Sequence, residues 1–163
     1  MEAGRYRTVL ANEFRPLRHG LFSQLLTKKK SLDLYHKAQD ELTQYSYGPC
    51  AVEEKENRTF IGFTGFHHFS FDTDFASGIE ILWRIRTQEW NKGYATEEAT
   101  ACLLYAKEDL PSLAVWSFTA IPNKASEKVM QKIGMEKIGE FQHPELPNGH
   151  LLPEHILYRK ELG

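Results

Sequence analysis

Apolar positions in the first half of the chain change their spacing once, and the change separates an expected helix from expected strands. Over residues 31–42, apolar side chains recur at steps of three and four, which is typical of an amphipathic helix. Two β-rich runs follow at 50–53 and 59–66, with turn-forming residues between them, and they predict a hairpin. Residues 14–17 fit a short edge strand, because they contain a proline.

The second half alternates strands with helices. Residues 79–85 alternate apolar and polar side chains, so one face of this strand is nearly all apolar and the other carries charge. Further elements are expected as a helix at 94–110, a strand at 113–121, a helix at 123–133, and strands at 135–141 and 155–158. A strand, a helix and a strand in this order imply a parallel pair joined by a crossover helix. We therefore expect an α+β fold with a mixed, mostly antiparallel sheet flanked by helices.

Both helices of the second half have an apolar stripe that is expected to face the core. In the helix at 94–110 the stripe consists of Ala95, Ala99, Cys102 or Leu103, and Ala106. In the helix at 123–133 it consists of Ala125, Val129 and Ile133, and Gly134 is expected to end this helix.

Size and charge exclude several classes of protein. The chain has 163 residues, so we expect a single domain over 1–163, and its hydrophobic content of 41% is typical of a globular protein. With 20 Lys and Arg against 22 Asp and Glu, its net charge of −2 provides no positive field for nucleic acid or acidic lipid. No apolar run reaches the length of a membrane span. We expect a cytoplasmic protein with no nucleic-acid or membrane partner.

Cysteine and histidine positions give no reason to expect a metal. Cys50 and Cys102 belong to no CxxC pair, so neither a disulfide framework nor a thiolate metal site is indicated. The segment from His150 to His155 lacks the spacing of a metalloprotease motif, and Pro153 would break the helix that such a motif needs.

The segment from Ile81 to Glu97 joins a strand to a helix through a tight turn that contains Gly93. The first N–H groups of a helix have no acceptor within the helix, and the helix dipole is positive at that end. Such a turn is suited to bind an anion such as a phosphate. An ordinary connection, in which the glycine serves only the geometry of the turn, explains the same residues, and the physical argument leaves both interpretations open.

The same turn, Trp90-Asn91-Lys92-Gly93-Tyr94-Ala95, resembles the pyrophosphate loop of the GNAT superfamily of N-acetyltransferases, written Gln/Arg-x-x-Gly-x-Gly/Ala. It is similar to the variant Trp-Gly-Lys-Gly-Tyr-Ala-Thr-Glu of the Rim-type branch, which acetylates the N-termini of ribosomal proteins. Residues 121–126 and 129–135 resemble the family segments Asn-x-x-Ser and Val-Met-Glu-Lys-Leu-Gly-Met. The resemblance extends over residues 31–162, and the part before it is shortened or divergent.

The resemblance implies an acyl-CoA N-acyltransferase fold whose sheet splits into a V. It implies that the main chain of Trp83, Arg84 and Ile85 bonds the pantetheine arm of acetyl-CoA. The residues implied to hold the pyrophosphate and the rest of this co-substrate are Trp90, Asn91, Lys92, Gly93, Tyr94, Ala95, Thr96 and Asn123. Asn123 is also suited to be the N-cap of its helix. No metal is implied.

Glu80 and Ser126 are the candidate catalytic residues. Glu80 lies on the strand face that leads to the acyl group and would act as general base, directly or through water; the alternative is an ion pair with Arg84. Many relatives have a tyrosine in the helix after Asn123 that protonates the leaving thiolate, but Met130 takes its place here. Ser126 matches the serine that some Rim-type enzymes use instead, and the alternative is an ordinary serine in the first turn of a helix.

The resemblance implies an N-acetyltransferase that moves the acetyl group of acetyl-CoA directly to a primary amine, which is a protein or peptide N-terminus or a small amine. An α-amino group, with a pKa of about 7.7–8.0, loses its proton more readily than a lysine at about 10.4, which favours an N-terminus. The alternatives are a non-catalytic acyl-CoA-binding sensor or interaction domain, and a structural domain that binds no acetyl-CoA. A homodimer stays open, because the sequence does not fix the oligomeric state.

Overall fold

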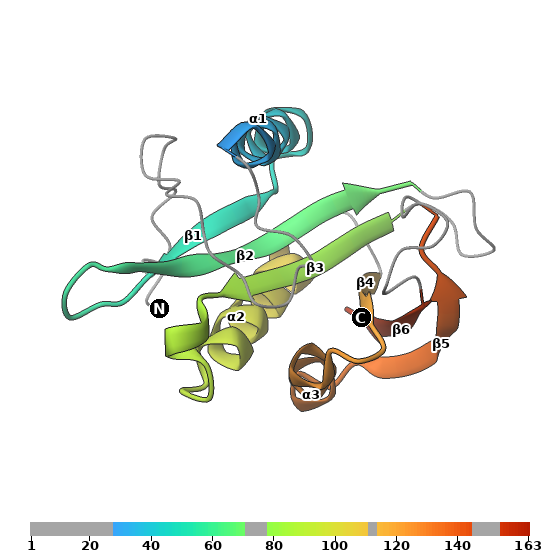
Figure 1. The fold of residues 1–163 in the computed structure, drawn as a ribbon. Coiled ribbons are helices and arrows are strands. Elements are labelled where there is room, and N and C mark those ends of the chain that lie inside the picture. The colour runs from blue at the N-terminus through green and yellow to red at the C-terminus, as the bar shows by residue number, and fades with distance from the viewer. Residues whose placement is uncertain (1–27, 71–77, 111–113, 145–153) are drawn as a thin grey trace. The chain divides into compact units, whose positions relative to one another are not determined.

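The structure is a computed structural model that describes residues 28–70, 78–110, 114–144 and 154–163. The elements within these ranges are α1 (Lys28–Tyr45), β1 (Pro49–Glu53), β2 (Phe60–Phe69), β3 (Gly78–Ile85), the 3-10 turn η2 (Thr87–Glu89), α2 (Tyr94–Asp109), β4 (Ala114–Ala120), α3 (Lys124–Lys132), β5 (Glu136–Gln142) and β6 (Glu154–Glu161) (Figure 1). The edge strand expected at 14–17 lies outside the described residues.

The strands form a six-stranded mixed sheet in the order β1-β2-β3-β4-β6-β5. β1 and β2 are antiparallel, which confirms the expected hairpin. β3 and β4 are parallel, with Glu80 opposite Trp116, and α2 is the crossover helix between them, as the sequence pattern predicts. β6 is antiparallel to both β4 and β5. The expected α+β class with a mixed sheet and flanking helices is thus confirmed.

Contacts within the chain divide it into two compact units, and each is described by itself. The first unit comprises Met1–His67 and Leu82–Glu98, and the second comprises His68–Ile81 and Ala99–Gly163. Strands β2 and β3 and helix α2 contribute residues to both units.

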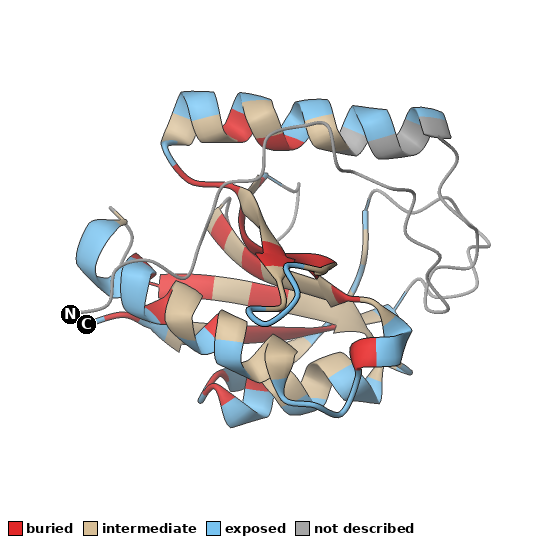
Figure 2. Cartoon of the chain, turned by 90° about the vertical axis from the view of Figure 1, so that its left-hand side faces the viewer, coloured by how far each residue is buried: buried red, intermediate tan, exposed pale blue. Residues whose placement is uncertain are grey.

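The first unit contains a buried apolar cluster that joins the hairpin to β3 and to the start of α2. Val52, Ile61 and Ile85 are buried together, and the first two residues of α2, Tyr94 and Ala95, pack against them. The start of α2 is therefore attached to the hairpin by apolar contact. On α1, the buried positions fall on one side and exposed positions on the other, as expected for an amphipathic helix (Figure 2).

Strands β2 and β3 approach each other closely at Gly62. A Cβ atom on this residue would lie 2.1 Å from the carbonyl oxygen of Arg84, so only glycine fits there. Two residues further along β2, the Thr64 hydroxyl donates a hydrogen bond of 3.0 Å to the Leu82 carbonyl oxygen of β3. These contacts fix the backbone of β3 at Leu82 and Arg84, within and next to the segment that is expected to bond the co-substrate arm.

The core of the second unit follows the alternation that the sequence predicts. Ile79 and Ile81 of β3 are buried, whereas Glu80 between them is half-buried. Because Glu80 and Trp116 are opposite each other in register, their side chains share the second face of these strands. On α2, Ala99, Leu103 and Ala106 of the expected stripe are buried, and Ala95 is half-buried.

The stripe expected on α3 is wrong in part. Ala125 is exposed, and the buried side chain of this helix is Met130, which is 1% exposed. The helix presents its largest apolar side chain to the core, because burying methionine removes more apolar surface from water than burying alanine. Gly134 has a φ of 75° and ends the helix as expected, with Met135 N–H bonded to Met130 O and Gly134 N–H to Gln131 O.

Candidate functional site

Trp90 anchors the turn between β3 and α2. Its indole Nε1–H donates a hydrogen bond of 2.7 Å to the carbonyl oxygen of Ile85, the last residue of β3. Its backbone N–H donates a bond of 3.2 Å to the Thr87 carbonyl oxygen. The aromatic side chain thus ties the turn to the end of the strand.

Asn91 and Gly93 give the turn its shape. Their φ angles are 63° and 89°, so left-handed residues lie on both sides of Lys92. A Cβ atom on Gly93 would meet no atom within 4 Å, which means that glycine is needed here for its conformation and not for space. Turns of this kind direct successive N–H groups into a shared concavity that can bind an anion.

The first turn of α2 adds main-chain donors to this concavity. The first helical hydrogen bond runs from Glu97 N–H to the Gly93 carbonyl oxygen at 3.0 Å. The N–H groups of residues 94–96 therefore precede the helical ladder, at the positive end of the helix dipole. A phosphate fits this donor set without a dedicated basic side chain.

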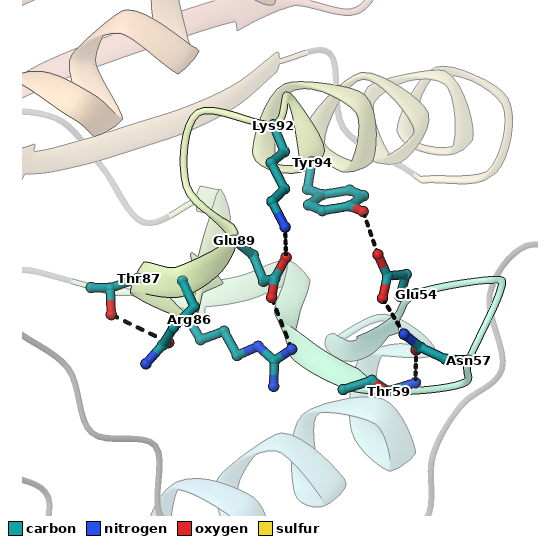
Figure 3. Close-up of polar contacts among 9 residues, drawn as sticks. Glu54, Asn57, Thr59, Arg86, Thr87, Glu89, Lys92 and Tyr94 are labelled. Atoms are coloured by element: carbon teal, nitrogen blue, oxygen red, sulfur yellow. Dashed lines mark hydrogen bonds and ion pairs between the residues drawn. The ribbon is translucent and has the colours of Figure 1, made fainter.

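A buried carboxylate, Glu89, holds two cations at the same turn (Figure 3). Glu89 Oε1 lies 2.9 Å from Arg86 Nη2, and Glu89 Oε2 lies 2.7 Å from Lys92 Nζ. These hydrogen bonds, that of Lys92 first, hold the pKa of Glu89 below its ordinary value. Glu89 thus compensates part of the positive charge of Arg86 and Lys92, and the Glu54 carboxylate also acts on Lys92.

A second carboxylate, Glu54, joins α2 to the hairpin turn (Figure 3). The Tyr94 hydroxyl donates a hydrogen bond of 2.9 Å to Glu54 Oε1, and Asn57 Nδ2 donates one of 2.6 Å to Glu54 Oε2. The bond to Glu54 raises the pKa of Tyr94. Tyr94 is thus held in two ways: its ring packs on the buried apolar cluster, and its hydroxyl is bonded to the hairpin turn.

The strand segment before the turn, Trp83 to Ile85, is partly covered. Ile85 is buried, whereas Trp83 and Arg84 are half-buried. The Arg84 guanidinium lies 5.4 Å from the centroid of the Phe63 ring, and burial lowers the pKa of Arg84 to about 10.

In the second unit, Glu80 lies in the register position opposite Trp116. The next carbonyl along β3, that of Ile81, accepts a hydrogen bond of 3.0 Å from the buried hydroxyl of Ser117. The carbonyl of Ile81, the residue after Glu80, thus has its hydrogen-bond partner on β4, at the residue after Trp116.

Ser126 lies in the first turn of α3 and is bonded to the N-cap residue, Asn123. Asn123 Oδ1 accepts the backbone N–H of Ser126 at 3.2 Å, which confirms the expected N-cap. Asn123 Nδ2 donates to Ser126 Oγ at 3.1 Å and to Thr119 Oγ1 at 2.9 Å.

The structure distributes the expected site residues over the two units. Trp83, Arg84, Ile85 and residues 90–96 belong to the first unit, and Glu80, Asn123 and Ser126 belong to the second. Sequence reasoning missed Glu89, Arg86 and Glu54. The spacing of three between Arg86, Glu89 and Lys92 was a usable signal for the first two, whereas Glu54 lies 40 residues from Tyr94 and gave none.

Two general features of the described residues bear on the class of site. No group of three His, Cys, Asp or Glu side chains among them lies close enough to hold a metal ion. None of the described helices combines the length and apolar character needed to cross a membrane.

Comparison with known proteins identifies the family of the chain. The model of the acetyltransferase (GNAT) domain family matches residues 9–136. The chain therefore belongs to the GNAT family of acetyltransferases, and the expected enzyme class, an acetyl-CoA-dependent acetyltransferase, is confirmed.

Three solved structures illustrate the likeness of fold. A GNAT-family acetyltransferase from Bacillus anthracis is 24% identical, with a TM-score of 0.66, over 85% of this chain and 76% of that chain. The ribosomal-protein-S5-alanine acetyltransferase from Vibrio fischeri is 19% identical, with a TM-score of 0.60, over 82% and 69%. A mutant of the spermidine N-acetyltransferase from Vibrio cholerae is 15% identical, with a TM-score of 0.62, over 81% and 75%. At these identities the likeness concerns the fold.

Proposed function

We propose that this chain is a Rim-type N-acetyltransferase that transfers the acetyl group of acetyl-CoA to a primary amine of a protein or peptide N-terminus or of a small molecule. The observation that carries the proposal is the turn at 90–96, where left-handed Asn91 and Gly93 precede the first N–H groups of α2. A diphosphate suits this turn, because its main-chain donors favour an anion.

The remaining contacts to the co-substrate come from β3 and α3 in this proposal. The main chain of Trp83, Arg84 and Ile85 bonds the pantetheine arm, and Asn123 offers the second lone pair of its Oδ1. The rigid backbone of β3, held at Gly62 and Thr64, supports the first of these roles.

Two side chains handle protons during the transfer. The amine nitrogen attacks the acetyl carbon, a C–N bond forms, the C–S bond breaks, and the amine proton passes to Glu80, directly or through water. Ser126 donates its hydroxyl proton toward the departing thiolate, directly or through water, and the proton held by Glu80 then returns to the serine through water. The products are the N-acetylated amine and coenzyme A with its free thiol.

Two considerations support an amine acceptor: the chemistry of acetyl transfer, and the substrates of two enzymes of similar fold. Their names specify an alanine of a ribosomal protein and spermidine, both of which offer an amine. An α-amino group is favoured over a side-chain amine, because it loses its proton nearer to neutral pH. We therefore propose a protein or peptide N-terminus as the first acceptor to test.

Calorimetric titration with acetyl-CoA, followed by a thiol-release assay over a panel of peptides, polyamines and small amines, tests the proposal. We expect binding, and release of coenzyme A that depends on at least one amine of the panel. Binding without release on any amine would favour the acyl-CoA sensor. Absence of binding would refute the assignment of the turn at 90–96.

A further inference from the structure

We propose that Asn123 is a positioning residue that orients the hydroxyl of Ser126, so that the serine proton is kept for the leaving thiolate. This inference rests on the proposed acetyl transfer. It gives Asn123 a role that differs from contact with the co-substrate.

The orientation of the Asn123 amide follows from the helix cap. The backbone N–H of Ser126 can only donate, so the atom that it meets at 3.2 Å is the carbonyl oxygen Oδ1. The other end of the amide is therefore the NH₂ group, which can only donate. Its two hydrogens go to Ser126 Oγ and Thr119 Oγ1, at 3.1 and 2.9 Å.

This arrangement determines what the serine hydroxyl can do. Ser126 Oγ accepts the hydrogen bond from Asn123, so its own O–H is not directed at Asn123 and has to donate elsewhere. Among the described residues, no side chain or carbonyl accepts this proton. In a capping box the N-cap N–H donates to the side chain three residues further on, but here the backbone N–H of Asn123 donates to the Ala120 carbonyl oxygen at 2.8 Å, so the donor that Ser126 Oγ meets is the Asn123 amide.

Thr119 holds the amide in place from the strand side. Its hydroxyl oxygen takes one hydrogen of the NH₂ group, and Ser126 takes the other. Three hydrogen bonds thus fix the Asn123 side chain between the end of β4 and the start of α3. Both amide hydrogens are used within the chain, which leaves Oδ1 as the polar atom of this side chain for other contacts.

The transfer step then has a defined proton path at the leaving group. As the C–S bond breaks, the Ser126 O–H donates to the sulfur, directly or through one water, while Oγ keeps the hydrogen bond from Asn123. That bond stabilises the negative charge that develops on Oγ. Water carries the proton from Glu80 to the serine, so both side chains end the cycle unchanged.

Replacement of Asn123 by aspartate separates this role from helix capping. Aspartate is as good an N-cap as asparagine, so the bond from Ser126 N–H is retained. The carboxylate only accepts, however, and it would take the Ser126 hydroxyl proton for itself. Asn123→Ser is the uncharged counterpart, since serine caps a helix but has no amide to donate.

The experiment is a double-mutant cycle on the rate of thiol release at saturating acetyl-CoA and amine, with Asn123→Asp, Ser126→Ala and the combined variant. We expect each single variant to lower kcat by about a hundredfold, within the range for a proton donor, and the double variant to be no more than about twofold slower than Ser126→Ala. Asn123→Ser is expected to lower kcat in the same direction, while urea unfolding of all variants stays close to that of the wild type.

Each failure has its own signature. If the wild type releases no thiol, the proposed function fails; if Ser126→Ala keeps full kcat, the role of the serine fails. If Asn123→Asp and Ser126→Ala multiply in the double variant, or if Asn123→Asp keeps full kcat, Asn123 does not act through Ser126 and the inference is overturned. Lys128→Gln, at an exposed position of the same helix, is the control and is expected to leave kcat unchanged.

Discussion

The hydroxyl of Tyr94 donates a hydrogen bond of 2.9 Å to Glu54 Oε1, and the two residues are 40 positions apart in the chain. The bond joins the first residue of α2 to the turn that follows β1. Because the Tyr94 ring also packs on Val52, Ile61 and Ile85, one side chain sets the position of the helix start relative to the hairpin. The proposed diphosphate turn, at residues 90–96, includes this residue.

Tyr94→Phe removes this hydrogen bond and keeps the ring. The bond raises the pKa of Tyr94 above its ordinary value of 10.0, so the stability it provides is present below pH 10 and is lost as the pH rises through the pKa of the folded state. We expect the variant to unfold at a lower urea concentration than the wild type at pH 8, and the difference to shrink above pH 10. Glu54→Gln, alone and combined with Tyr94→Phe, is the control: two purely additive effects would show that the pair is not coupled.

Gly93→Ala tests the shape of the turn. A left-handed conformation costs roughly 1–2 kcal/mol for a residue with a Cβ, and no atom lies within 4 Å to hold an alanine in it. We expect the turn to relax and the Kd for acetyl-CoA to rise about tenfold, as measured by calorimetry. Gly139→Ala is the matched control, because a Cβ there also meets no atom within 4 Å and no left-handed φ is involved. If the two variants bind acetyl-CoA with equal affinity, the conformation of the turn is not needed for binding.

Glu89→Gln tests the carboxylate that holds Lys92 and Arg86. The pKa of Glu89 lies below its ordinary value, so its contribution to stability is present above the pKa of the unfolded state and is lost as the pH falls through that of the folded state. We expect Glu89→Gln to be less stable than the wild type at pH 7, with a difference that disappears on acidification toward pH 3. Urea unfolding across this range is the measurement. Glu136→Gln, at an exposed position, should follow the wild type throughout; a Glu89 difference that grows in acid would contradict the ion pairs.

Glu80→Gln tests the proposed general base. Removal of a general base typically costs about 10²–10⁴ in rate, so we expect kcat to fall about a hundredfold while calorimetry gives an unchanged Kd for acetyl-CoA. A variant with the wild-type rate would favour a purely structural role for Glu80, such as the ion pair with Arg84.

Local patterns were sufficient for most of the fold. The alternation at 79–85 and the stripe on α2 specify which face is buried, because strand and helix periods are properties of neighbouring residues. The stripe on α3 failed because Ala125 and Met130 both fit a helical period, and the space available in the core decides between them. The sequence alone does not specify how much space the core offers to each side chain.

The site was predictable where it depends on main-chain geometry and missed where it depends on distant partners. The sequence predicted a tight turn with Gly93 before a helix, and the structure has such a turn, with left-handed φ angles at Asn91 and Gly93. The pairing of Glu54 with Tyr94 needs the hairpin to be folded, so no local rule could indicate it. The bond between Asn123 and Ser126 lies within one helical turn, yet capping rules predict only its backbone half.

The left-handed pair on either side of Lys92 also bears on how distant relatives of this enzyme can be recognised. Donors that belong to the peptide backbone survive any replacement that preserves the two dihedral angles, so a tryptophan and an asparagine can enter the loop without removing them. A search that requires particular letters at these positions passes over such chains. A search for two residues of positive φ around one intervening residue, directly before a helix, would retrieve them.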